Sequence, residues 1–356
     1  EGAVMSWTLC IDFGTAYSKA AAAPSDAWSR FEPGSIRPLM LGGQGAGNPF
    51  LLESAVFVDD DRLLFGPAAV ARAEALSESK RAALRSFKTL LGVSDLDRAL
   101  NTGVPASIDP HRLFSMGELI MLYLAYLNAA IGRAVAADPR LAAVRGFDRR
   151  YAAPAWRTGD SAGLHGVVMR LFGQAEALQD ALGPTALSSD GIAIEQAREA
   201  LSAARASTRL SDMGLIFEAT AAGAYTSVGL EVEAPALIVL DMGAGTTDIA
   251  VLARAGARVE ELADARVTLK QAGDYVDRII ANLVVAANPR IKAVADQGRL
   301  WRLAMGAMRD LKETLFIEGR ASFRHDGRVT QITMRALEKD RDFRAFKAGL
   351  EHAYNR

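Results

Sequence analysis

Cysteine and net charge are both scarce in this sequence. Cys10 is the only cysteine among 356 residues, so no disulfide can form within the chain, and a reducing, cytoplasmic compartment is expected. The formal net charge is −1, which gives no electrostatic reason to expect a nucleic acid or a membrane surface as a partner. The 4 histidines are scattered without the spacing of metal ligands, so no histidine-built metal site is expected.

Long hydrophobic runs and the familiar hydrolase motifs are also missing. No basic segment leads into a long apolar core near the N-terminus, so no signal peptide is expected. The most apolar stretch, residues 119–132, ends at Arg133 and is too short to span a bilayer, which favours a buried helix. The sequence contains neither a G-x-S-x-G elbow nor a Walker lysine loop, which argues against serine-hydrolase and P-loop chemistry.

The patterning that is present alternates strand hairpins with helices, which is typical of the α/β class. The length favours two lobes. Strand hairpins are expected at residues 7–23, 54–66, 235–256 and 321–334, a short strand near 146–154, and a strand entering a helix at 213–229. Helices are expected at residues 68–91, 117–136, 160–182, 191–210, 273–287, 299–318 and 335–355.

Two of the hairpins share an unusual turn. The segment "IDFGTAYSKA" covers residues 11–20 and "LDMGAGTTDIA" covers residues 240–250; each runs from an apolar residue through Asp-x-Gly into small and hydroxyl residues. The glycine lets the backbone approach an anion, and the turn offers its N–H groups to phosphate oxygens. The aspartate can hold a hydrated Mg²⁺ that bridges phosphates. One such turn in each lobe would form a clamp on a triphosphate.

The order of these motifs resembles the nucleotide-binding domain of the seventy-kilodalton heat-shock chaperones, in the actin-like ATPase superfamily. Besides the two hairpins, "IFEATAAGAY" resembles the connecting segment that carries a glutamate, and "YAAPAW" resembles the strand that ends in a hinge proline, here Pro154. "AGDYVDR" resembles the family's double-glycine segment, and "MRDLKETL" places a lysine where the family has one near the adenosine. The resemblance runs from about residue 8 to the C-terminus.

The resemblance implies an α/β protein of two ribonuclease H-like lobes with a nucleotide cleft between them. Lobe I is expected at residues 1–234, with a core at 5–36 and 113–234 and a smaller subdomain at about 37–112. Lobe II is expected at residues 235–356, with a core at 235–271 and a subdomain at about 272–356. The chain ends before the family's last glycine-rich segment and before its peptide-binding domain, so the second lobe is expected to be incomplete.

The family's functional residues carry over by position. Asp12 and Asp241 would hold Mg²⁺ through water, and Glu218 and Asp248 would order the water that attacks the γ-phosphate, with Thr246 beside them. The implied ligands are ATP or ADP with Mg²⁺, the implied activity is slow ATP hydrolysis, and the implied partners are a client protein or a co-chaperone. The residues implied in nucleotide binding are Gly14, Thr15, Ala16, Tyr17, Gly243, Ala244, Gly245, Thr246, Gly273 and Lys312.

Several positions depart from the family pattern. The family has a lysine four residues after the glycine that ends the second hairpin, but "FGPAAV" places Val70 there, and Arg72 and Lys80 lie nearby in sequence. Ala16 stands where the family has a phosphate-binding threonine, and residues 176–210 read as an added helical pair. These changes leave open a second interpretation, a nucleotide-binding scaffold with little or no turnover. A small-molecule kinase of the same superfamily is a third and lesser alternative.

Overall fold

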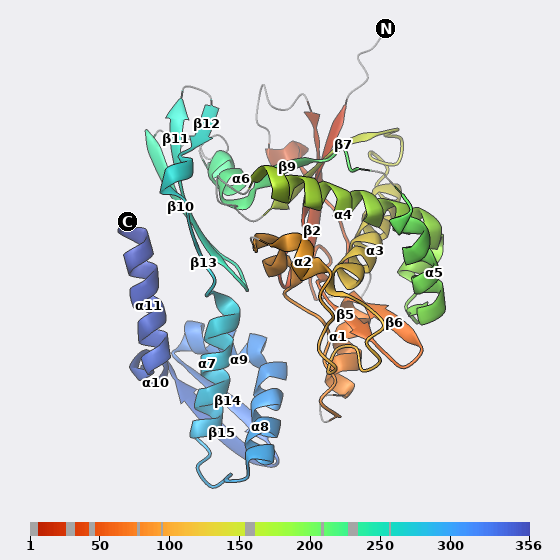
Figure 1. The fold of residues 1–356 in the computed structure, drawn as a ribbon. Coiled ribbons are helices and arrows are strands. Elements are labelled where there is room, and N and C mark those ends of the chain that lie inside the picture. Colours follow the sequence, from red (N-terminus) through yellow and green to blue (C-terminus); the bar gives the residue numbers. More distant parts are fainter. Residues whose placement is uncertain are drawn as a thin grey trace. The chain divides into compact units, whose positions relative to one another are not determined.

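The computed structural model describes residues 6–25, 33–42, 47–76, 79–93, 95–153, 161–207, 210–226, 234–255 and 258–356. They form a mixed α/β protein with several sheets (Figure 1). The chain divides into two compact units. The first unit comprises Glu1–Ala73, Arg81–Val239 and Ala250–Arg266, and the second comprises Glu74–Lys80, Leu240–Ile249 and Val267–Arg356. Pro154 lies outside the described residues.

The first unit is built on a sheet of strand order β3-β2-β1-β7-β9, with β4 beside β2. β1 pairs antiparallel with β2 and parallel with β7, and β7 pairs parallel with β9. Parallel neighbours of this kind require crossovers, which the intervening helices supply. The strands are β1 (Trp7–Asp12), β2 (Tyr17–Pro24), β3 (Arg37–Pro38), β4 (Leu52–Glu53), β7 (Phe147–Ala153) and β9 (Gly214–Phe217).

The helix α3 (Met116–Ala137) is the centre of the first unit's hydrophobic core. It begins with a capping box, because the Ser115 hydroxyl accepts from the Glu118 amide while the Glu118 carboxylate accepts from the Ser115 amide. Within the described residues, α3 is the one helix long and apolar enough to cross a membrane, yet most of its apolar stretch is buried inside the protein. Its burial is that of the core helix of a soluble protein, as the apolar stretch at 119–132 predicted, although the helix is longer than that stretch.

The remaining elements of the first unit surround this sheet and helix. A small sheet joins β5 (Val56–Val58), β6 (Arg62–Phe65) and β8 (Ile192–Ala193), with the β5–β6 turn on three aspartates as expected. The helices α4 (Ser161–Leu182) and α5 (Ile194–Arg205) pack against each other, and α4 also packs on α3. The other elements are α1 (Gly66–Ala75), the 3₁₀ helices η2 (Pro33–Ser35), η4 (Phe87–Gly92) and η5 (Gly183–Leu187), α2 (Leu96–Leu100) and α6 (Glu218–Ala224).

The helix expected at 68–91 is wrong beyond Ala75, where α1 ends. The following segment is held by tertiary contacts instead: Leu84 bridges Val56 of β5, and the Arg81 guanidinium lies over the ring of Phe57. Burial of Leu84 against this small sheet outweighs the helix propensity of the alanine-rich sequence. The chain then turns through Ser86, whose φ is 56°, and enters η4.

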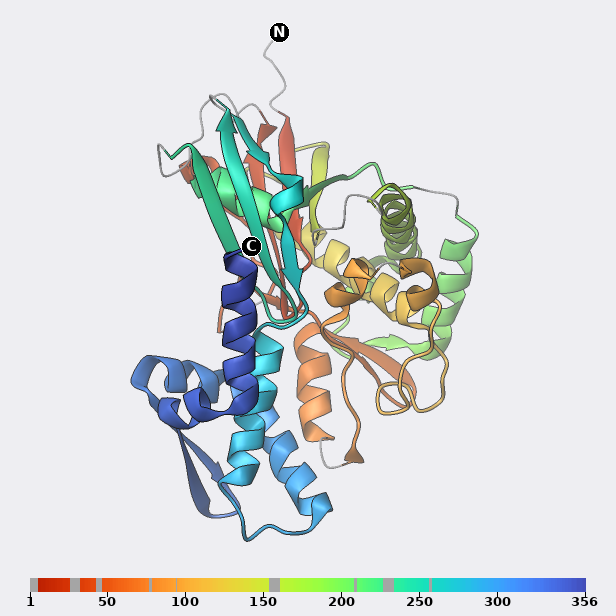
Figure 2. The same ribbon diagram turned by 60° about the vertical axis from the view of Figure 1, so that its left-hand side comes forward.

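A four-stranded sheet follows, in the order β10-β11-β12 with β13 also beside β11; its long strands are green to teal in Figure 2. Its members are β10 (Ala236–Met242), β11 (Thr247–Ala255), β12 (Arg258–Glu261) and β13 (Val267–Leu269), with the 3₁₀ helix η7 (Ala263–Ala265) between the last two. The division into units passes through β10 and β11. The sequence predicted the β10–β11 hairpin and missed the two short, partly charged strands.

The second unit has its own hydrophobic core, formed by α7 (Gly273–Ala286), α8 (Val294–Gly306), α9 (Met308–Glu318) and the β14–β15 hairpin. β14 (Arg320–His325) and β15 (Arg328–Thr333) join through Asp326-Gly327, both at positive φ, as the Asp-Gly pair predicted. Each of the two long helices expected here is divided. Gly306 ends α8, and Asp340 separates α10 (Met334–Lys339) from α11 (Arg341–Tyr354) by capping the latter.

Candidate functional site

The first Asp-x-Gly turn lies between β1 and β2, where Asp12 is the last β1 residue and pairs with Lys19 of β2. Gly14 follows in the turn at a position with no room for a side chain. A Cβ there would lie 2.1 Å from the carbonyl oxygen of Tyr17, which is a backbone atom and cannot rotate away. Glycine is therefore required here by close backbone approach.

The carbonyl groups of this turn are held from one side by Ser54. The Ser54 hydroxyl donates to the Gly14 carbonyl at 2.8 Å, and the Ser54 amide donates to the Ala16 carbonyl at 2.9 Å. Within the described residues, no hydrogen bond has the amide of Thr15 or Ala16 as its donor. Unused successive N–H groups in a turn are the donors that bind phosphate oxygens elsewhere in proteins.

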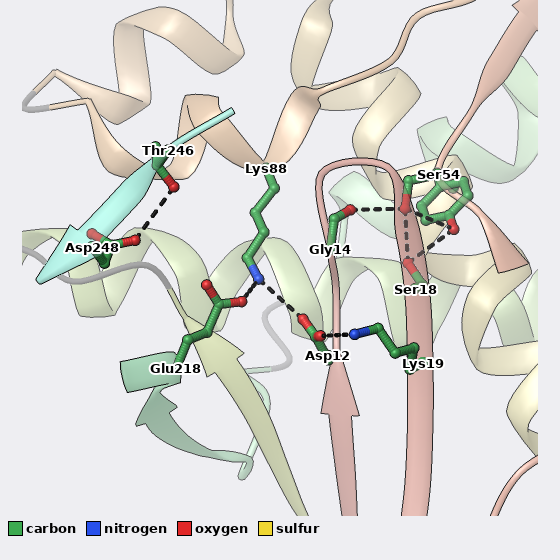
Figure 3. Close-up of polar contacts among 10 residues, drawn as sticks. Asp12, Gly14, Ser18, Lys19, Ser54, Lys88, Glu218, Thr246 and Asp248 are labelled. Atoms are coloured by element: carbon green, nitrogen blue, oxygen red, sulfur yellow. Dashed lines mark hydrogen bonds and ion pairs between the residues drawn. The ribbon is translucent and has the colours of Figure 1, made fainter. Parts of the chain in front are cut away.

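Lys88 connects two of the expected site residues. Its ammonium group forms an ion pair with the Asp12 carboxylate at 3.1 Å and with the Glu218 carboxylate, as Figure 3 shows. The Lys88 side chain is 6% exposed, whereas Lys19, which reaches the other Asp12 oxygen at 3.3 Å, is 55% exposed. A buried lysine ammonium requires charged or hydrogen-bonding partners, and these two carboxylates supply them.

The three charged groups come from different parts of the first unit. Asp12 ends β1, Glu218 is the first residue of α6 directly after β9, and Lys88 lies on η4. The sequence predicted the two carboxylates but not Lys88, because its segment was expected to be helix. One feature of the sequence could have pointed to Lys88. It lies in the largely apolar segment "SFKTLLG", and a lysine in such a segment must either reach solvent or pair with a carboxylate.

The family's lysine position is occupied by Val70, but a lysine from another segment lies beside the first turn. Val70 lies on α1, and the cation beside Asp12 and Glu218 comes from Lys88. Arg72 forms an ion pair with a different carboxylate, that of Asp59, at 2.6 Å. Burial alone would raise the pKa of Asp59, but the Arg72 guanidinium brings that pKa below its usual value. The carboxylates of Asp12 and Glu218 therefore have a positive charge beside them, which the sequence did not predict.

The second Asp-x-Gly turn lies in the second unit, between β10 and β11. Here the turn's carbonyl groups accept hydrogen bonds from the first residues of α7. The Gly273 amide donates to the Gly243 carbonyl at 3.1 Å, and the Asp274 amide donates to the Ala244 carbonyl at 2.7 Å. Among the described residues, the amides of Ala244 and Gly245 donate no hydrogen bond. Both turns thus have occupied carbonyl groups and unused amides, although different elements hold them.

The carboxylate of Asp248 is buried in this unit, with 4% of the residue exposed. It accepts hydrogen bonds from the Thr268 hydroxyl at 2.5 Å and from the Thr246 hydroxyl at 3.3 Å. These bonds offset the cost of burying the carboxylate and fix the rotamer of Thr246 beside the turn. Asp241, at the same place in its hairpin as Asp12, is half-buried near the end of β10.

Lys312 and Gly273 also belong to the second unit. The Lys312 ammonium pairs with the Asp277 carboxylate at 2.7 Å and lies 3.5 Å from where a Cβ on Gly273 would be. Burial raises the pKa of Asp277, and the Lys312 charge opposes this shift. Lys312 is thus anchored close to the Gly243–Gly273 contact by its ion pair with Asp277.

A separate polar cluster in the first unit fixes the helix that carries Glu218. The Glu261 carboxylate of β12 accepts from the Thr220 hydroxyl of α6 and from the Arg266 guanidinium at 2.6 Å. The same guanidinium lies 4.3 Å from the ring centroid of Phe217, directly before Glu218. Burial alone would raise the pKa of Glu261, but the hydrogen bonds from Arg266 and Thr220 bring that pKa below its usual value.

The lowered pKa of Glu261 makes stability depend on pH. Its ionised form is favoured in the folded state, so its contribution is present above the ordinary glutamate pKa of 4.5 and is lost as the pH falls below it. Chemical denaturation at pH 6 and at lower pH values should show a smaller loss of unfolding free energy for Glu261→Gln than for wild type. Equal pH dependence in the two proteins would mean that this cluster does not stabilise α6.

The hydrogen-bond donors of the two turns are backbone amides, which are the groups that bind phosphate oxygens. Among the described residues, no group of three or more His, Cys, Asp or Glu side chains could hold a metal ion. A Mg²⁺ bound through water and phosphate oxygens needs only one or two carboxylates, and each Asp-x-Gly turn carries one, Asp12 in the first unit and Asp241 in the second. The unused turn amides at Thr15, Ala16, Ala244 and Gly245 are suited to the phosphate oxygens.

No protein-family model matches this chain, and no curated protein matches it.

Proposed function

We propose that this chain is a Mg-ATP-binding domain of the two-lobed actin-like ATPase type, similar to that of the seventy-kilodalton heat-shock chaperones. It binds nucleotide between its lobes and hydrolyses ATP slowly, and closure of the lobes signals to a client protein or co-chaperone. The setting is the cytoplasm, in keeping with the single cysteine and the buried apolar helix α3. The observation that carries the proposal is the buried ammonium of Lys88 between Asp12 and Glu218.

The first requirement of this function is a set of donors for phosphate, which the two turns would supply. Each Asp-x-Gly turn has unused amides and carbonyl groups held by other parts of its own unit. Because those carbonyl groups are occupied, their negative ends are fixed away from an incoming anion. A β- or γ-phosphate would accept from the amides of Thr15 and Ala16, and from those of Ala244 and Gly245 in the other unit.

Phosphoryl transfer to water is the second requirement. It depends mainly on positioning and charge neutralisation, so a fixed cation near the γ-phosphate has a large effect. Lys88 supplies that cation, and its ion pair with Glu218 holds the carboxylate that would orient the attacking water. Mg²⁺, when bound, would neutralise phosphate charge beside Asp12 and Asp241. Thr246 would face the phosphates, with its rotamer fixed by the buried Asp248.

A nucleotide-binding scaffold with little turnover remains the second candidate, because Ala16 offers no hydroxyl to the phosphates. Lys88 weighs against it, since a scaffold does not need a buried cation at this position. A small-molecule kinase is less well supported, because no base for a second substrate is identified.

Steady-state assays of phosphate release and of ADP release with Mg-ATP, with and without candidate sugars, separate the three functions when nucleotide binding is measured beside them. Slow release that is independent of sugar supports the ATPase. Binding of nucleotide without release of phosphate supports the scaffold. Sugar-dependent release of ADP without release of phosphate supports the kinase.

A further inference from the structure

A chain of buried hydroxyl groups runs from the core helix α3 to the first phosphate turn. The Tyr123 hydroxyl lies 3.0 Å from the Ser18 hydroxyl, and the Ser18 hydroxyl lies 3.0 Å from that of Ser54. The Ser54 hydroxyl in turn donates to the Gly14 carbonyl at 2.8 Å (Figure 3). Tyr123, Ser18 and Ser54 are each no more than 2% exposed.

The direction of donation along these hydroxyl groups follows from the final acceptor, the Gly14 carbonyl. A carbonyl oxygen can only accept, so the Ser54 hydrogen is given to Gly14. Ser54 then has no hydrogen left for Ser18 and accepts from it at 3.0 Å. Ser18 has likewise used its hydrogen and accepts from Tyr123 at 3.0 Å, and the Tyr123 hydroxyl also donates to the Glu53 carbonyl at 3.2 Å. Burial raises the pKa of Tyr123, so the phenol keeps the proton that starts the chain.

This direction gives the Ser18 and Ser54 hydroxyls one donated and one accepted hydrogen bond each, so both are buried with their hydrogen-bonding groups satisfied. The aromatic surroundings support the arrangement, since the ring of Phe13 lies 5.7 Å from the ring of Tyr123. Hydrogen bonds arranged in series polarise one another, so removal of one member weakens the next.

We infer that the relay Tyr123–Ser18–Ser54 positions the Gly14–Ala16 turn for phosphate, and that Ser54 is a positioning residue for nucleotide. This inference rests on the proposed function. Ser54 holds the turn at two points, through its hydroxyl to Gly14 and its amide to Ala16. These bonds fix the carbonyl groups on the Ser54 side and leave the amides of Thr15 and Ala16 for the ligand. If Ser54 loses its hydroxyl, the Gly14 carbonyl has no partner there, and the peptide can rotate so that its oxygen opposes the phosphate.

The substitutions form a graded series. Ser54→Ala removes the bond to the turn itself and should weaken Mg-ADP binding by about tenfold to a hundredfold, the size expected for an unsatisfied buried polar group. Ser18→Ala should have a smaller effect, and Tyr123→Phe the smallest, because the hydroxyl groups nearer the turn remain. Tyr126→Phe is the matched control: it lies on the same helix, stacks on Phe65, and donates no hydrogen bond among the described residues.

Calorimetric titration of Mg-ADP into the folded proteins, with a melting curve for each, is the test. A purely structural role would lower the melting temperature and leave the dissociation constant of the folded protein unchanged. That result, for both Ser54→Ala and Tyr123→Phe, would overturn the inference. If Ser54→Ala does not fold, the decision rests on Ser18→Ala and Tyr123→Phe, whose weakened binding relative to Tyr126→Phe is the supporting result.

The wild-type titration distinguishes failure of this inference from failure of the proposed function. Absence of Mg-ADP binding by wild type would overturn both. Binding by wild type with unchanged affinity in the series would overturn the relay alone.

Discussion

Replacement of Lys88 by methionine is expected to slow single-turnover ATP hydrolysis by about 10²–10³, the usual effect of removing one donor aimed at developing charge. Methionine keeps much of the side-chain length but carries no charge. The variant would leave the carboxylates of Asp12 and Glu218 without their shared buried cation. It should therefore also unfold at a lower temperature, since breaking a buried ion pair by removing one partner is costly.

Two comparisons make the Lys88 result specific. Arg72→Met removes another cation from the first unit, but its guanidinium pairs with Asp59, so its turnover should match wild type. Lys19→Met removes the second, exposed partner of Asp12, and its effect should be much smaller because solvent screens that pair. Rates are measured in a rapid-mixing assay at saturating Mg-ATP. Equal losses for Lys88→Met and Lys19→Met would contradict a special role for the buried ammonium.

Replacement of Gly14 by alanine is expected to have the second largest effect. The added methyl would lie 2.1 Å from the Tyr17 carbonyl oxygen, so the turn itself has to move. Such overpacking typically costs about 1–3 kcal/mol, and here it also displaces the amides proposed to bind phosphate. Mg-ADP affinity should fall by more than tenfold, about 1.4 kcal/mol or more of binding free energy.

Gly243→Ala, at the matching position of the other turn, is the comparison. A Cβ there would lie 3.5 Å from the Thr246 carbonyl oxygen, an ordinary contact. Its cost in stability and in affinity should therefore be clearly smaller than that of Gly14→Ala. Calorimetric titration and thermal melts of both variants measure the difference. A Gly243→Ala effect as large as that of Gly14→Ala would show that steric room at the turn is not the deciding factor.

Local patterns in the sequence were sufficient for much of the fold. The alternating apolar residues of β1 and β2, the Asp-Gly turn between β14 and β15 and the strand-to-helix step at Glu218 were all predicted, because each depends on neighbouring residues. The sequence selected Asp12 for Mg²⁺ and Glu218 for the attacking water as separate roles, and the structure joins the two carboxylates through Lys88.

The features that the sequence did not reveal depend on distant residues. Residues 79–93 are rich in helix-forming side chains, yet the contact of Leu84 with Val56 keeps part of this segment extended. That tertiary preference brings Lys88 to the carboxylates, and no local pattern encodes it. The hydroxyl relay was missed for the same reason: Ser18, Ser54 and Tyr123 are unremarkable in sequence and meet only in the folded unit.

The most direct test of the central claim is calorimetric titration of ATP into the wild-type protein, with Mg²⁺ present and with Mg²⁺ chelated, and the same titrations of Asp12→Asn and Asp241→Asn. Two Asp-x-Gly turns that hold one Mg-nucleotide predict one-to-one binding that is strengthened by Mg²⁺, and loss of that strengthening in either variant, although the two aspartates belong to different units. Wild-type binding that is absent, or that is equally strong with and without Mg²⁺, would contradict the account.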